Sequence, residues 1–128
     1  MIKYKKSGSL YILTEKIHRD TEIKPHKPIN GINSYMGTSG RIVLLPGYKW
    51  DGATGALDTP DIMESSAFHD FICTEYENGH LTKAQRKQGD KLFKQMNKET
   101  DMPSARVKWT FQAVRKFFEV KEWFKKLF

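Results

Sequence analysis

A histidine and an aspartate, His69 and Asp70, stand side by side in this chain, and a second aspartate, Asp90, follows further along. The segment between them has the pattern of a helix, a turn at Asn78–Gly79 and a second helix. Two neighbouring helices would bring His69 and Asp90 to similar heights. Because a histidine backed by a carboxylate is typical of a general base or of a metal site, these residues are the candidate site.

The symmetry of the expected hairpin pairs His69 with Asp90. In a regular antiparallel hairpin, residues equidistant from the turn face one another, and each of the two lies about ten positions from the turn centre. Asp90 shares a helical face with Phe93 and Met96, so we expect its carboxylate to be buried. A buried carboxylate needs a partner. If Asp90 holds one ring nitrogen of His69, the other nitrogen is left as a base or a ligand.

The loop Gly47–Gly55 supplies candidate cation ligands. Its three glycines and Asp51 favour tight turns that present backbone carbonyls beside a carboxylate. Asp70 lies about 100° around the helix from His69 and would line a facing wall. We therefore expect a hard cation, Ca²⁺ rather than Mg²⁺, bound by Asp70, Asp51 and Gly52. Such a cation would polarise an ester or phosphoryl oxygen while His69 activates water.

A structural explanation stays open for both motifs. A buried histidine bonded to an aspartate can be purely architectural, and Asp51–Gly52 alone is an ordinary turn signal. In that case these residues stabilise the fold and bind no substrate.

Short strands precede helices along the chain. A Pro- and Gly-rich connection over 24–31 interrupts the strand-like part. The β-prone segments are 10–13, 41–45 and 48–50. We expect an α+β fold, with short antiparallel strands followed by a three-helix unit. It would form one domain over residues 1–128, strand-rich over 1–50 and helical over 59–128.

Three helices are predicted by their start signals. A threonine followed by proline and aspartate predicts a helix over 59–76, and a capping-box pattern predicts another over 82–99. The third begins at Asp101 or Ser104. Its apolar spacing slips after Glu119, which predicts a kink or a separate short helix there.

The net charge of +7 is unevenly distributed. Residues 1–49 hold nine basic and three acidic residues (+6), residues 50–102 six and ten (−4), and residues 103–128 seven and two (+5). This charge distribution has two explanations. The charged residues are simply solvated, or the acidic central segment attracts cations while the basic flanks favour phosphate-bearing partners.

The composition is that of a folded domain. A hydrophobic fraction of 38% is too high for a disordered chain, and the lone Cys73 cannot form an internal disulfide. No apolar stretch follows Met1–Lys6, so we expect no signal peptide. No apolar run approaches the roughly 18 residues of a transmembrane helix.

Four segments share their order and spacing with a known family. They are Gly47–Thr54, Ala67–Phe71, Gly89–Phe93 and Ala113–Arg115. Together they resemble the phage and prophage family called domain of unknown function 1353, over roughly residues 10–123. The resemblance implies a bacteriophage or prophage origin, and with it a location in the host-cell cytoplasm or in the virion.

Three segments carry a second resemblance: Trp50–Thr54, His69–Phe71 and Asp90–Phe93. They are similar to the calcium loop and catalytic helices of secreted phospholipases A2, especially the compact bacterial and fungal type. In that family the histidine is the general base, the next aspartate binds calcium with loop carbonyls, and the later aspartate orients the histidine. The resemblance implies these roles for His69, for Asp70 with the loop near Asp51–Gly52, and for Asp90. It implies calcium-dependent ester hydrolysis.

The segment 105–128 mixes lysine and arginine with phenylalanine and tryptophan. A basic amphipathic helix with aromatic residues is typical of a membrane interface, so a phospholipid or membrane surface is one expected partner. Alternatively, the aromatic residues cover the core and the basic ones are solvated. Nucleic acid is a third and weaker option, because aromatic and basic residues together stack on bases and neutralise phosphates.

Two functional hypotheses follow from the sequence. The first is a bacteriophage accessory protein with a divalent-cation-assisted His/Asp hydrolase site. The alternative is a non-enzymatic virion or host-interaction protein that uses its basic surfaces to bind protein or nucleic acid.

Overall fold

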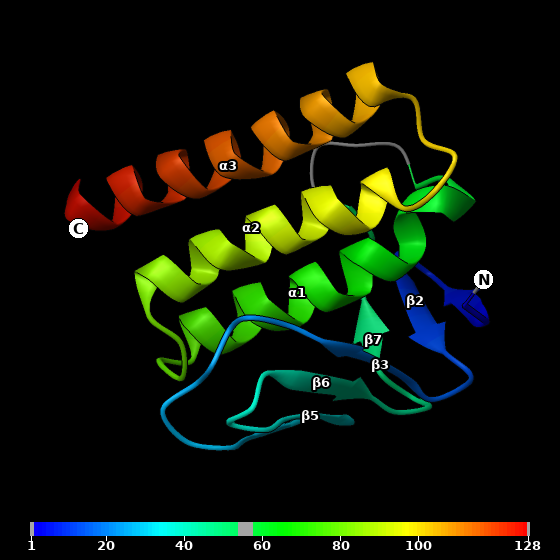
Figure 1. The fold of residues 1–128 in the computed structure, drawn as a ribbon, viewed down its shortest axis with the longest axis horizontal. Helices are drawn as coiled ribbons and strands as arrows, with labels where there is room; N and C mark the ends of the chain where they lie inside the picture. The colour runs from blue at the N-terminus through cyan, green and yellow to red at the C-terminus, as the bar shows by residue number, and fades with distance from the viewer. Residues whose placement is uncertain (1, 54–57, 128) are drawn as a thin grey trace.

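The computed structural model describes residues 2–53 and 58–127 (Figure 1). The strands are β1 (Tyr4–Ser7), β2 (Leu10–Leu13), β3 (Ile17–Asp20), β4 (Ile29–Gly31), β5 (Ser34–Met36), β6 (Arg41–Leu44) and β7 (Lys49–Trp50). The helices are the 3₁₀ turn η1 (Pro60–Ile62), α1 (Met63–Glu77), α2 (Lys83–Lys98) and α3 (Ser104–Leu127). The expected α+β class, with antiparallel strands before three helices, is confirmed.

The described strands form two antiparallel sheets, ordered β1-β2-β7 and β3-β6-β5-β4. The β-prone segment 48–50 contains β7, which pairs with β2 and not with the preceding β6, and Trp50 lies opposite Tyr11. The chain changes sheet at Pro46–Gly47, where Gly47 adopts a φ of 97° that favours glycine. The connection over 24–31 is also shorter than expected, because its last three residues form β4.

The turn between α1 and α2 has the expected chemistry. Gly79 takes a left-handed φ of 82° after α1, and Thr82 and Gln85 form the predicted capping box of α2. The start of α1 differs from the prediction. Thr59 makes no side-chain cap and its hydroxyl donates to Asp61 instead, so a 3₁₀ turn comes first and α1 begins at Met63.

The predicted kink near Glu119 is wrong, because α3 runs without a break to Leu127. Polar contacts hold its second half along the end of α1. Tyr76 donates a 2.6 Å hydrogen bond to Glu122, and Lys125 pairs with Glu77 at 3.1 Å. The slip in apolar spacing therefore marks side chains that turn to solvent. None of the described helices has the length and apolarity needed to cross a bilayer.

The elements are stacked in layers. In Figure 1, α1 lies between the strands and α2, and α3 covers α2 on the side away from the strands. One buried apolar cluster joins both sheets to the helices. Trp50 Nε1 donates a 3.0 Å hydrogen bond to Ser66, which fastens β7 to α1. Asp51 and Gly52, which follow β7, thus share a cleft lining with Ser66 and His69 in the middle of α1.

The helices α1 and α2 approach closely at Gly89. A Cβ atom at this position would lie 2.6 Å from Ile72 Cγ2, which is closer than real Cβ contacts. The glycine lets the two backbones meet beside Asp90, the next residue of α2.

Candidate functional site

His69 of α1 and Asp90 of α2 are in contact, as hairpin symmetry predicted. His69 Nε2 lies 2.7 Å from Asp90 Oδ1, and both side chains are buried. An ionised carboxylate only accepts hydrogen bonds, so Nε2 carries the proton that is donated to Asp90. In the neutral imidazole, Nδ1 therefore keeps its lone pair and is the nitrogen available to act as a base.

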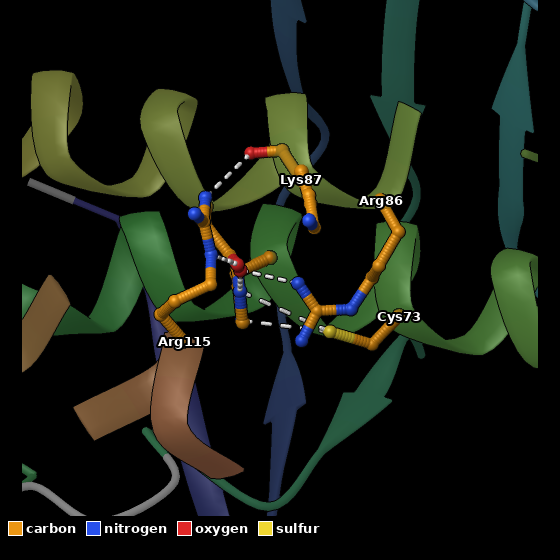
Figure 2. A network of polar contacts seen from close by, with 6 residues as sticks. Cys73, Arg86, Lys87 and Arg115 are labelled. Carbon is orange, nitrogen blue, oxygen red and sulfur yellow. Dashed lines mark hydrogen bonds and ion pairs between the residues drawn. The ribbon is translucent and has the colours of Figure 1, made fainter. Parts of the chain in front are cut away.

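Two arginines also bind Asp90. Arg86, one turn earlier in α2, donates through Nη1 to Oδ1. Arg115 of α3 donates through Nε to Oδ2 at 2.9 Å, and its Nη2 reaches the carbonyl of Lys87 at 3.4 Å (Figure 2). Burial alone would raise the pKa of Asp90, but the bond from His69 and the two arginines lower it to about 2. Asp90 is therefore ionised at neutral pH.

Cys73 lies against the imidazole, with its Sγ within 3.9 Å of both ring nitrogens. Its Sγ lies 3.6 Å from His69 Nδ1, one helical turn further along α1. Burial alone would lower the pKa of His69, but the neighbouring Cys73 sulfur and the hydrogen bond to Asp90 raise it to about 9. With a pKa of about 9 the ring is charged at neutral pH, so Nδ1 loses its proton and becomes available as a base only as the pH rises toward 9.

A cleft of about 350 Å³ opens beside this network. Its lining includes His69, Asp70, Asp51 and Gly52, while Asp90 supports His69 from behind. The structure thus brings together all five residues that the sequence proposed. Four α3 residues complete one wall of the cleft: Val114, Phe117, Phe118 and Lys121.

Asp70 has one partner from the strand-rich part of the chain. Its Oδ2 accepts a 2.8 Å hydrogen bond from the Tyr48 hydroxyl. Burial raises the pKa of Tyr48, which keeps the phenol protonated as a donor. Burial and the charge of Asp51 raise the pKa of Asp70 to about 6, against the opposing effects of Tyr48 and His69. The carboxylates of Asp70 and Asp51 therefore repel each other across the cleft.

The backbone at Gly52 is fixed by Asp58. Gly52 has a φ of 88°, and a Cβ there would collide with the Asp58 carboxylate. Asp58 accepts from the backbone N–H of Ala53 at 2.9 Å and from the hydroxyl of Tyr11 at 3.0 Å. The rest of the predicted cation loop, Thr54–Gly55, lies outside the described residues.

The donor set partly fits the expected cation. Asp70 and Asp51 are carboxylates of the kind that Ca²⁺ prefers. Across residues 2–53 and 58–127, however, no three His, Cys, Asp or Glu side chains gather as a metal-binding group. A cation held by these two aspartates would take its other oxygen ligands from backbone carbonyls, water or substrate.

The sequence reasoning missed several residues of this site. Arg86 carried a usable signal, because it lies four residues before Asp90 on the same helix. Tyr48 and Cys73 lie close in sequence to Asp51–Gly52 and His69–Asp70, but no pattern predicted their contacts. Arg115 lies in one segment of the first resemblance, but its contact with Asp90 had no local signal, because that contact depends on how α3 docks.

The chain matches no protein family model, no curated protein and no solved structure. What the two resemblances imply therefore stays a prediction, and the chemistry of the site rests on its own geometry.

Proposed function

We propose that the protein is a hydrolase that cleaves esters with His69 as general base and a divalent cation as electrophile. The main support for this proposal is the orientation of the His69 imidazole. Asp90 holds Nε2 at 2.7 Å, while the cleft on which His69 borders also contains Asp70 and Asp51. A base and two carboxylates that share a cleft of about 350 Å³ suit hydrolysis of a small polar linkage.

In its neutral form, which dominates above a pKa of about 9, His69 would take a proton from water at Nδ1. The hydroxide then attacks the ester carbonyl carbon, and the proton on Nδ1 passes to the departing alkoxide. Throughout, the Nε2–H bond to ionised Asp90 keeps the ring oriented and stabilises its charged form. When bound, Ca²⁺ at Asp70 and Asp51 would supply Lewis-acid polarisation of the carbonyl.

The two resemblances found in the sequence support a particular substrate class and a particular biological origin. Similarity of the Asp51 loop and the His69 and Asp90 helices to phospholipases A2 favours a phospholipid ester. Similarity to the phage family favours a bacteriophage accessory protein.

Fatty-acid release from mixed phospholipid vesicles tests the reaction. We expect release with Ca²⁺ and none with a chelator. His69→Ala should lower the rate by about 10²–10⁴-fold, the usual contribution of a general base. His80→Ala is the matched control, because His80 pairs with Glu75 and is not part of the cleft lining. No release with any divalent cation would overturn the hydrolase proposal.

Thermal melting tests the cation separately. A bound cation should raise the Tm by mass action, and Asp70→Asn should abolish the rise. Asp20→Asn removes an exposed carboxylate that pairs with Arg41 and should leave the rise intact. A rise that persists in Asp70→Asn would contradict the assignment of the cation to this aspartate.

The convergence of donors on Asp90 favours a second candidate function. Three helices each send one side chain to this carboxylate, which is also what a purely structural ion cluster requires. The protein would then be a non-enzymatic virion or host-interaction factor. In that case His69→Ala would lower the Tm, and neither variant nor wild type would release fatty acid.

A further inference from the structure

The outer face of α3 carries a second apolar stripe. Val107, Thr110, Val114 and Phe118 are buried on the inner face. Beside this buried face and extending away from it lie large apolar side chains that are each 43–56% exposed. These side chains, here called the outer stripe, are Trp109, Phe117, Val120, Trp123, Phe124 and Leu127.

The outer stripe is continuous. From Phe117 to Leu127 its members recur at three- and four-residue spacing and so share one side of the helix, while Trp109 lies two turns earlier. Other exposed apolar side chains in the described chain, such as Leu10 and Ile32, stand apart on the strand-rich half. Scattered apolar residues need no explanation, but a concentrated patch is typical of an interaction surface. Figure 1 shows α3 as the outermost element, with the strands on the far side of α1 and α2.

The charges beside the outer stripe are mainly positive. At about 100° per residue, Lys116 falls within the stripe, and Lys108 and Lys126 lie about 60° beyond it on the side of Glu119. In the described part of the chain, no carboxylate forms an ion pair with any of these lysines. Of the two acidic residues of α3, Glu122 is bonded to Tyr76 and only Glu119 lies near this edge. The stripe therefore suits an anionic occupant.

A second copy of the chain is a poor occupant, because it would bring the lysines of one stripe against those of the other. An anionic bilayer matches both features of the stripe. Tryptophan and phenylalanine settle at the headgroup boundary, and each lysine near an anionic leaflet adds about 1 kcal/mol of attraction.

The outer stripe also adjoins the cleft. Phe117 belongs to the stripe and lines the cleft that contains His69, and Lys121 lines the same wall. A bilayer against the stripe would therefore lie at the edge of the cleft. We propose that the outer stripe, with Lys108, Lys116 and Lys126, binds the surface of an anionic phospholipid bilayer. The consequence for catalysis rests on the proposed function, since the cleft would then receive its substrate from the membrane.

Co-sedimentation with ether-linked vesicles tests binding without turnover, because these lipids contain no carboxylic ester to cleave. We expect wild type to bind vesicles that contain phosphatidylserine, to bind pure phosphatidylcholine weakly, and to lose affinity as salt rises. His69→Ala should bind like wild type. This design separates the two proposals, because hydrolysis can fail while binding persists.

Two double variants locate the surface. Trp123→Ala with Phe124→Ala should lower partitioning by about tenfold or more, from the apolar area removed. Lys116→Gln with Lys126→Gln should lower it by about thirtyfold, from roughly a fivefold loss per lysine. Circular dichroism would verify that each variant is folded, since all four side chains are exposed.

Lys5→Gln with Lys6→Gln is the matched control. It removes the same charge from exposed residues of β1 and should reduce binding far less. Equal losses in this control and in the α3 lysine variant would overturn the proposal.

Three other outcomes would also overturn it. These are absence of wild-type binding to anionic vesicles, binding to duplex DNA in its place, and a lipid-free dimer that dissociates in the Trp123→Ala, Phe124→Ala variant.

Discussion

At the scale of single residues, Asp90 is the point on which three helices converge. It accepts hydrogen bonds from His69 of α1, Arg86 of α2 and Arg115 of α3, and it is fully buried. Burying a lone carboxylate would cost several kcal/mol. The three donors offset that cost and also fix the orientation of the imidazole. Stability and the candidate chemistry thus depend on the same carboxylate.

We expect acid to weaken the fold through Asp90. Its pKa is about 2 in the folded protein against an ordinary 3.8. A lowered pKa stabilises the fold above the unfolded value, and this stabilisation is lost as pH falls through the folded value. Urea unfolding between pH 5 and pH 2 should therefore show a loss of about 2 kcal/mol from this group.

Asp90→Asn should remove that pH dependence. It should also destabilise the protein at neutral pH by about 3–5 kcal/mol, because Arg86 and Arg115 lose their carboxylate. Asp101→Asn changes an exposed aspartate and serves as the control. An undiminished acid-dependent loss in Asp90→Asn would show that other carboxylates are responsible.

The site could be predicted from the sequence where local helix geometry determines a contact. His69 and Asp90 could be paired because two regular helices joined at Gly79 leave little freedom in register. Arg86 could have been found from its four-residue spacing to Asp90. Arg115 could not, because its contact requires the docking of α3, which no local pattern encodes.

At the scale of elements, Gly89 sets the distance between α1 and α2. The position has no room for a methyl group beside Ile72, whose branched side chain is stiff. Any larger residue would push the helices apart one position before Asp90. The contact between His69 and Asp90 therefore depends on a residue that touches neither ring nor cleft.

Gly89→Ala should destabilise the protein by about 1–3 kcal/mol through overpacking, although alanine alone favours a helix by about 1 kcal/mol. In an Ile72→Ala background the same change should be neutral or stabilising, because the colliding methyl is gone. A double-mutant cycle from urea unfolding measures this coupling. An equal effect in both backgrounds would contradict close approach at this position.

The elements themselves were predictable where their signals were local. The Thr82 capping box and the Gly79 turn are as predicted. Thr59 was misread because its hydroxyl had a nearer partner in Asp61. The pairing of β7 with β2 joins strands far apart in the sequence, and propensity does not specify such partners.

At the scale of the whole molecule, one apolar cluster spans both sheets and the helices. We expect cooperative unfolding in a single transition, because neither sheet has a separate core. In a Trp109→Phe, Trp123→Phe variant, the buried Trp50 alone reports on β7 and α1. Its fluorescence and the far-ultraviolet circular dichroism should give coincident urea transitions. Separate midpoints would show that the strands and helices unfold independently.

Cys73 gives the cleft a native chemical reporter. It is the single cysteine of the chain, it is partly exposed, and its sulfur lies 3.6 Å from Nδ1 of His69. A molecule that occupies the cleft will shield this thiol, so the rate of its alkylation measures occupancy. Wild-type protein can therefore be screened by mass spectrometry against esters, cations and lipids, with each adduct confined to one known atom.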